Sequence, residues 1–184
     1  MAFQPAYLSV DIEAAGPHPA AYALLSIGAC TITQPEAVFY AELQPTSLKI
    51  EGQAQQVHGL DPQVLAETGR PPEAVLADFE AWVQANTPPD HRPVFVAFNA
   101  PFDWMFVCDY FHRYLGRNPF GHSALDIKAL YMGQQGGGWF ETSYNQVSRA
   151  LQVDRPLAHN ALQDARDQAE LFRRLLDGLS KRGA

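Results

Sequence analysis

The sequence predicts a single α/β domain in which a partly parallel sheet carries an antiparallel edge. Three strand-type segments with short connections come first, and strand-type and helix-type segments alternate after residue 70. The 184 residues are 47% apolar, which is enough for one proper core, and no repeat, low-complexity tract or linker interrupts them. We therefore expect residues 1–184 to form one domain.

Three β-strands are predicted in the N-terminal part. Residues 7–13 alternate apolar and polar side chains with a period of two. Residues 24–33 and 37–43 are rich in strand-favouring side chains, and the turn-type sequence 34–36 separates them. The glycine and the prolines between positions 14 and 23 favour a surface loop. This order of strands and short connections predicts an antiparallel meander.

Helical periodicity and a buried strand follow. Residues 71–87 form the first helical pattern, bounded by proline pairs. Its apolar positions are Val75, Leu76, Phe79, Trp82 and Val83. Residues 93–98 are continuously apolar, as in a central strand buried on both faces. A helix is predicted over 101–115, with Asn99 as its cap and Pro101 in its first turn.

The C-terminal part ends in the strongest helical pattern of the chain, over residues 160–181. Its predicted apolar face consists of Ala161, Ala165, Ala169, Phe172, Leu176 and Leu179. Before it we expect a short strand at 123–127, a flexible glycine loop at 136–138 and a helix at 143–151. Residues 53–60 are too short and too polar to assign.

Charge and cysteine content narrow the class of protein. The formal net charge of −7 leaves no global basic field to attract long nucleic acids or anionic membranes. Cys30 and Cys108 lie in apolar segments and are expected to be buried thiols, not a disulfide. Because no signal peptide or membrane-spanning run is present, we expect no membrane association and a cytoplasmic location.

Two carboxylates follow from the alternation in the first strand. Leu8, Val10 and Ile12 point towards the core in this pattern. Asp11 and Glu13 then emerge together on the opposite face. Adjacent like charges are costly in a cleft unless a cation lies between them, and oxygen ligands of this kind suit Mg²⁺ or Mn²⁺. The alternative for such a short motif is a solvated strand end.

Three more candidate groups lie at the starts of helices. Asp103 falls in the first turn of helix 101–115, where it can also simply complement the helix dipole. His159 and Asp164 lie at the entry of the last helix and can face one cleft. For His159 alone, a capping or surface role is the plain alternative. All these positions are places where α/β sheets carry their sites.

The candidate groups together favour phosphodiester hydrolysis. Four carboxylates in one site carry a charge that two divalent cations neutralise, and paired cations clamp the attacking and leaving oxygens of an in-line displacement. His159 is then the natural general base, because the reference pKa of histidine lies near neutrality.

Three segments in order, DIE, NAPFD and HNALQD, resemble the exonuclease motifs of the DEDDh 3′-5′ exonucleases. Two further stretches between them are similar to segments of that superfamily: LLSIGAC, and the Val-His-Gly sequence within 56–60. The resemblance extends from about Tyr7 to Leu176, nearly the whole chain. Each motif alone is weak, but three motifs in order at suitable spacing are specific.

The resemblance implies an RNase H-like fold, with a five-stranded mixed sheet whose second strand is antiparallel and with helices on both sides. It implies a two-metal-ion mechanism with Mg²⁺ or Mn²⁺. Asp11 would bridge both ions, Glu13 and Asp164 would hold the catalytic one, Asp103 would serve the second, and His159 would activate the nucleophile.

The substrate-binding residues implied by the resemblance include Ala14 and Ala15, whose backbone would contact the terminal nucleotide. Many members carry threonine at one or both positions, so a hydroxyl contact is missing here. His58 and Asn99 are further candidates for substrate contact. Trp104 is predicted either to stack on a base or to pack in the core.

Other aromatic and motif positions are less decisive. Phe98 stands where the family often has a histidine. Phe102 lies on the apolar stripe of its helix and is predicted to be a core residue. Trp139 and Phe140 follow three glycines and form either a flap over the substrate or an ordinary exposed turn.

The expected function is metal-dependent removal of nucleotides from the 3′ end of short, single-stranded or 3′-overhanging nucleic acid, because an acidic surface neutralises few phosphates of a long duplex. DNA and RNA both remain open as substrates, as does a homodimer. The alternatives are a catalytically silent nucleic-acid-binding module of the same fold and an α/β domain with a structural acidic cluster.

Overall fold

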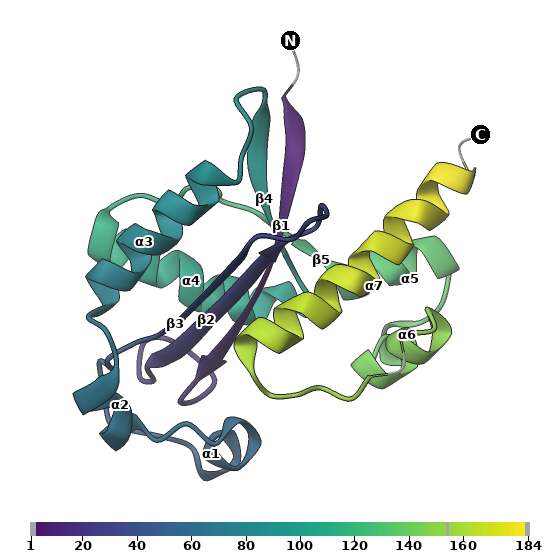
Figure 1. Ribbon diagram of the computed structural model, residues 1–184. Helices are drawn as coiled ribbons and strands as arrows, with labels where there is room; N and C mark the ends of the chain where they lie inside the picture. The colour runs from purple at the N-terminus through teal and green to yellow at the C-terminus, as the bar shows by residue number, and fades with distance from the viewer. Residues whose placement is uncertain (1–2, 154, 183–184) are drawn as a thin grey trace.

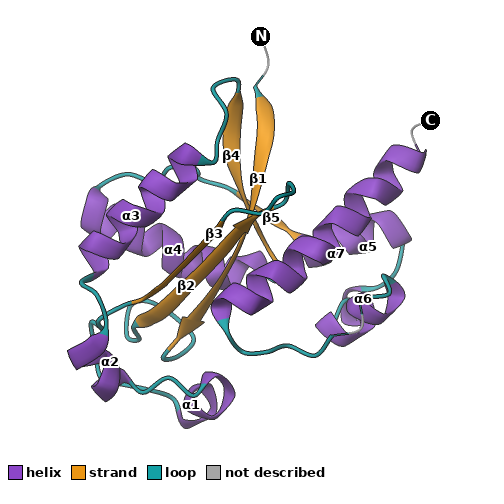
Figure 2. Ribbon diagram, viewed as in Figure 1, coloured by secondary structure: helices purple, strands orange, loops and turns teal. Residues whose placement is uncertain are grey.

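The computed structural model describes residues 3–153 and 155–182 and contains one mixed sheet with helices on both faces (Figures 1 and 2). The strands are β1 (Gln4–Ala14), β2 (Leu24–Thr31), β3 (Val38–Glu42), β4 (His91–Ala97) and β5 (Ala124–Asp126). Their order is β3-β2-β1-β4-β5. β2 is antiparallel to β1 and β3, whereas β4 is parallel to β1 and β5. The predicted five-stranded mixed sheet with an antiparallel second strand is confirmed.

The helices form a layer on each face of the sheet (Figure 1). They are α1 (Gly52–His58), α2 (Pro62–Thr68), α3 (Pro72–Ala85), α4 (Ala100–Leu115), α5 (Ile127–Gln135), the 3₁₀ turn η1 (Trp139–Glu141), α6 (Tyr144–Ala150) and α7 (Ala161–Arg182). α3 and α4 cover one face, where Phe79 and Phe106 join the main core. α7 and α5 cover the other, where Phe172 and Ile127 pack on Val96.

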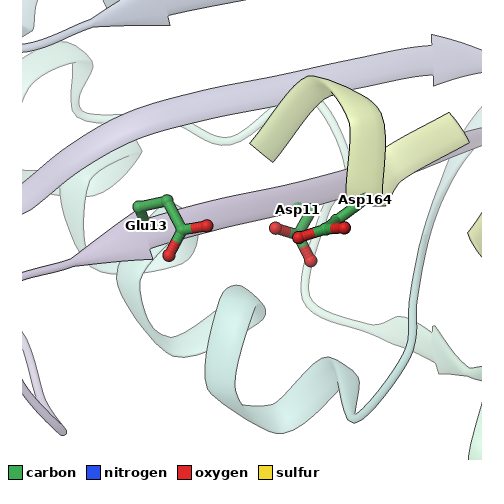
Figure 3. Close-up of side chains that lie close together, drawn as sticks. All are labelled: Asp11, Glu13 and Asp164. Carbon is green, nitrogen blue, oxygen red and sulfur yellow. The ribbon is translucent and has the colours of Figure 1, made fainter. Parts of the chain in front are cut away.

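Alternation along β1 decides what each face receives. Leu8, Val10 and Ile12 are buried in the main core beneath α3 and α4. The period of two therefore directs Asp11 and Glu13 to the opposite face, which α7 covers. The strand thus delivers its carboxylates to the helix that carries Asp164, as Figure 3 shows.

The start of α4 corrects one prediction. Asn99 occupies the cap position with a left-handed backbone (φ 64°), but its side chain makes no capping hydrogen bond. The first donor of the helix, Ala100 N–H, is instead bound by Asp126 Oδ2 at 2.7 Å. Asp126 Oδ1 also accepts from Ala129 N–H at 2.7 Å and caps α5. A carboxylate at the end of β5 therefore anchors two helices.

α1 lies in the stretch 53–60 that the sequence left unassigned, and α2 follows in residues for which no element was predicted. α2 has a recognisable start, because Asp61 accepts from Gln63 N–H at 2.8 Å and Pro62 follows it. α1 is polar and ends at Gly59 in the left-handed region (φ 69°). Neither helix presents enough apolar positions to show a periodicity. One position on α7 was also predicted wrongly, since Leu179 is 43% exposed.

The cysteine prediction is confirmed for Cys30 and only in part for Cys108. Both cysteines are free thiols; Cys30 is buried, whereas Cys108 is only partly buried. Burial raises the pKa of the Cys30 thiol to about 12, and this thiol donates to Ala165 O at 3.6 Å. Within residues 3–153 and 155–182, no helix has the length and apolarity that crossing a membrane requires.

The first turn of α7 lies directly on β2 at Gly28. A Cβ added there would come within 2.2 Å of the Ala161 carbonyl carbon and the Leu162 nitrogen. Gly28 is also the residue opposite Asp11 in the antiparallel ladder. The absence of a side chain at this position therefore lets α7 approach Asp11, and Asp164 follows within the first turns of the helix.

We expect Gly28→Ala to displace the start of α7, because backbone atoms cannot move aside as a flexible side chain can. The free energy of unfolding should fall by about 1–3 kcal/mol. The nuclease activity expected from the sequence should fall more than this destabilisation explains at a temperature where the variant is folded. Urea denaturation and initial rates measure the two effects. Gly178→Ala is the matched control, since a Cβ at Gly178 meets nothing within 4 Å. Equal behaviour of the two variants would contradict the packing argument.

Candidate active site

Three carboxylates from two elements meet at the end of β1. Asp11 and Glu13 come from β1 and Asp164 from α7, and one oxygen of each lies within 4.8 Å of the others. Figure 3 shows the carboxylates of Asp11 on β1 and of Asp164 on α7 close together, with Glu13 further along β1. Three hard oxygen donors of like charge at this spacing fit divalent cations such as Mg²⁺ or Mn²⁺.

The electrostatics of this carboxylate cluster also fit a cation. Burial raises the pKa of Asp11 well above its usual range, and the charges of Asp103, Glu13 and Asp164 raise it further. Burial and then the charge of Asp164 raise the pKa of Glu13 to about 7. Burial likewise raises the pKa of Asp164. The ionised forms are therefore disfavoured without positive charge, which bound cations would supply.

Asp103 approaches the cluster from α4. It is 3% exposed, and its Oδ1 accepts from Ile12 N–H at 3.1 Å, so it ties α4 to β1. Burial raises its pKa, although the hydrogen bonds from backbone N–H groups oppose this. Its charge acts on Asp11, but Asp103 lies outside the group of three carboxylates within 4.8 Å. The structure therefore places this predicted ligand beside the cluster.

Asp164 holds the loop that carries His159. Its Oδ1 accepts from Ala158 N–H at 2.8 Å and its Oδ2 from Asn160 N–H at 3.2 Å. His159, between these two donors, is exposed and has a left-handed backbone (φ 52°). Burial raises the pKa of Asp164, and the charge of His159 partly opposes this rise. One carboxylate thus fixes the backbone on either side of the histidine.

A pocket of about 320 Å³ opens beside the cluster. Its lining residues are Glu13, Ala14, Gly16, Pro17, Glu51, Ala54, Val57, His58 and Phe102. His58 Nδ1 accepts from Leu60 N–H at 3.0 Å, so Nε2 carries the proton and donates to Ala14 O at 3.3 Å. Burial lowers the pKa of His58, which favours this neutral form. The pocket has mostly apolar walls, and Glu13 and Glu51 add two acidic side chains to its lining.

The pocket separates the predicted substrate-binding residues. Ala14 and His58 line it. Ala15 is fully buried, and its N–H donates to Ala23 O at 2.9 Å, so this N–H is not free to contact a nucleotide. Asn99 is exposed at the start of α4.

The aromatic predictions also divide. Trp104 packs edge-on against Phe95, with ring centroids 5.3 Å apart, and is not among the pocket residues, so packing is the alternative that the structure supports. Phe102 contacts the core as predicted and also lines the pocket. Trp139 and Phe140 form the exposed 3₁₀ turn η1, and Phe140 is 94% exposed.

Four buried or partly buried residues around the cluster were not singled out from the sequence: Asp126, Tyr144, Asp167 and Gln168. Gln168 donates to Asp11 Oδ1, and Asp167 accepts from Arg155 at 3.1 Å. The hydroxyl of Tyr144 is buried without a hydrogen-bond partner among the described residues, and burial raises its pKa to about 12. Only Gln168 had a usable signal, because a residue four positions after Asp164 shares its helix face.

The fold and the carboxylate cluster together fit the class of nuclease that the sequence motifs predict. The chain matches the model of the 3′-5′ exoribonuclease Rv2179c-like domain over residues 6–176, and it belongs to this family. It is also 42% identical over 176 residues to the 3′-5′ DNA exonuclease Cap18 of Escherichia coli. This alignment covers 96% of this chain and 94% of that protein.

Solved structures show the same fold at low identity. The nuclease domain of 3′hExo, a DEDDh family member bound to rAMP, superposes with a TM-score of 0.78 at 13% identity, covering 94% of this chain and 92% of that one. E. coli Exonuclease I in complex with a dT13 oligonucleotide gives 0.71 at 19% identity, covering 97% of this chain and 42% of that one. Taken with the family match, the protein is a 3′-5′ exonuclease that hydrolyses phosphodiester bonds.

Glu13 provides a test of the cluster in the metal-free protein. Its folded pKa of about 7 lies above its ordinary value of 4.5, so the folded state holds a proton that the unfolded state has released between these values. Stability from this group is present at low pH and lost as pH rises towards 7. Glu13→Gln should therefore raise the free energy of unfolding at pH 8 by roughly 1–3 kcal/mol and flatten its fall between pH 5 and 8.

Urea denaturation in EDTA at several pH values measures this effect. Glu67→Gln, on the exposed side of α2, is the control and should follow the wild-type pH profile. Parallel profiles for wild type and Glu13→Gln would show that Glu13 experiences no such burial.

Proposed function

We propose that the protein removes nucleotides from the 3′ end of single-stranded or 3′-overhanging DNA by a two-metal-ion mechanism with His159 as general base. The observation that carries the proposal is the meeting of Asp11, Glu13 and Asp164 beside a pocket of about 320 Å³. DNA is favoured over RNA because the relative at 42% identity, aligned over nearly the full length of both chains, is a DNA exonuclease. The family description favours RNA and supplies the second candidate.

The pocket suits the terminal nucleotide. Its volume and its walls from Phe102, Val57 and His58 allow a base to be held by apolar contact, without any need to read its sequence. Glu13 forms one edge, so the phosphodiester bond of a base seated here would lie next to the cluster.

The catalytic groups have separate tasks. Bound Mg²⁺ or Mn²⁺ would neutralise the charge of the phosphate and make the attacking water easier to deprotonate. Asp11, Glu13 and Asp164 would hold the ions, with Asp103 beside them on α4, where it accepts from Ile12 N–H. His159 lies on a loop that Asp164 fixes from both sides, and its exposed ring can accept the proton of the attacking water. We further propose a single-domain enzyme of the cytoplasm, in agreement with its acidic charge and free thiols.

Metal dependence is the first test. With 5′-labelled single-stranded 12-mers of matched sequence, we expect stepwise shortening of DNA in Mg²⁺ or Mn²⁺, slower shortening of RNA, and none in EDTA. Asp11→Asn should lower the rate by at least about 100-fold and abolish the rise of Tm in millimolar metal. Faster cleavage of RNA would assign the substrate to the family description, and full activity in EDTA would remove the metal mechanism.

His159 is tested separately from the metal site. His159→Ala should lower kcat by about 100-fold or more, the usual contribution of a general base, and leave the Mn²⁺-induced rise of Tm unchanged. His122→Ala is the matched control, because His122 is exposed on the loop between α4 and β5. Undiminished turnover of the His159 variant would exclude the general-base role.

A further inference from the structure

Gln168 connects three elements of the site through one side chain. It lies on α7, one helical turn after Asp164, and is only 2% exposed. Its Nε2 donates to Asp11 Oδ1 on β1, and its Oε1 accepts from Phe98 N–H, just after β4, at 2.9 Å. Both ends of the amide are therefore used: one contacts β1, and the other contacts the residue that follows β4.

The two partners dictate the orientation of the amide. Phe98 N–H can only donate, so it requires the amide oxygen. An ionised Asp11 carboxylate can only accept, so it requires the amide N–H₂ group. Rotation of the amide by 180° would place its N–H₂ group against Phe98 N–H, two donors, and its oxygen against the Asp11 carboxylate, two acceptors. The hydrogen bond to Asp11 is thus imposed by the backbone of the chain and does not depend on a free choice of rotamer.

Asp103 and Asp164 are held by backbone donors. Ile12 N–H holds Asp103, and two N–H groups of the His159 loop hold Asp164. Asp11, in contrast, accepts a hydrogen bond from the side chain of Gln168. Because Gln168 and Asp164 share one helix, this contact also ties the Asp11 carboxylate to the element that carries the opposing carboxylate.

Buried polarity at this position calls for a reason other than packing. Position 168 lies between buried Asp164 and buried Phe172 on the inner side of α7, where an apolar side chain would also fill space. A fully paired amide fixes direction in a way that an apolar side chain cannot. Side chains that hydrogen-bond a metal ligand orient it, and their loss typically costs 10–100-fold in metal affinity or activity.

We propose that Gln168 is a positioning residue that locks the Asp11 carboxylate in the orientation needed to share cations with Glu13 and Asp164. The proposal rests on the metal site of the proposed function. It assigns Gln168 no contact with substrate: its action passes through Asp11 alone.

The test is Mn²⁺ binding to the full-length protein, measured from the free Mn²⁺ signal in electron paramagnetic resonance. Gln168→Met and Gln168→Leu remove the amide that donates to Asp11 and replace it with an apolar side chain of similar size. We expect the Mn²⁺ dissociation constant to rise at least about 10-fold and the Mn²⁺ concentration for half-maximal activity to rise with it, while circular dichroism shows a folded protein.

Gln134→Met is the matched control. Gln134 Nε2 donates to Leu175 O on the same helix α7, at a distance from the carboxylates. This variant should bind Mn²⁺ as the wild type does, although it also loses a glutamine hydrogen bond to α7. The comparison separates the orientation of Asp11 from a general loosening of the helix.

Three results would overturn the proposal. Mn²⁺ affinity within twofold of wild type in a folded Gln168 variant would show that Asp11 needs no positioning. An equal loss of affinity in Gln134→Met would attribute the effect to helix α7 as a whole, and failure of both Gln168 variants to fold would assign a structural role. Absence of Mn²⁺ binding by the wild type is a different result, because it contradicts the proposed two-metal function itself.

Discussion

Electrostatic repulsion among partly buried carboxylates is the constraint to which the architecture of the site responds. Asp11, Glu13 and Asp164 are brought within 4.8 Å of one another, and burial raises the pKa of each. Neutral donors form hydrogen bonds to two of these carboxylates: the Gln168 amide to Asp11, and two backbone N–H groups to Asp164. Neutral donors orient carboxylates without cancelling their charge, so the capacity to bind cations is kept.

Most arginine side chains of the described residues are already paired with acidic residues. Arginines of the described chain form ion pairs with acidic residues of their own fold, namely Arg70, Arg113, Arg117, Arg155, Arg166, Arg173 and Arg174. The pair of Arg155 with Asp167 joins the loop before α7 to the helix. With these guanidinium groups engaged and a net charge of −7, the protein has little overall attraction for a polyanion, and the cations of the proposed mechanism would supply a local one.

Backbone proximity makes this arrangement possible. β1 sends its apolar residues to one face and its carboxylates to the other, while Gly28 on the neighbouring strand allows α7 to lie against the sheet. Asp103 then reaches Ile12 N–H from α4, on the far side of the same strand. The site is therefore assembled from both helical layers around the end of one strand, and its precision depends on how closely those layers pack.

The sequence by itself determined the elements and the acidic residues. Periods of two and 3.6 are local properties, so β1, β2, α3, α4 and α7 could be predicted from the spacing of apolar residues. The order of DIE, NAPFD and HNALQD indicated the fold and the five candidate residues through family resemblance. The short polar helices α1 and α2 escaped, because they have too few apolar positions to define a face.

Tertiary structure alone decided the partners of each polar group. Nothing in the sequence shows that Asp126, and not Asn99, binds the first N–H of α4, or that Gln168 spans from Phe98 to Asp11. It also does not show that Ala15 is enclosed while Ala14 lines the pocket. These contacts join residues far apart in the chain, and hydrogen bonds depend on tenths of an ångström, which only the packing of helices on the sheet sets.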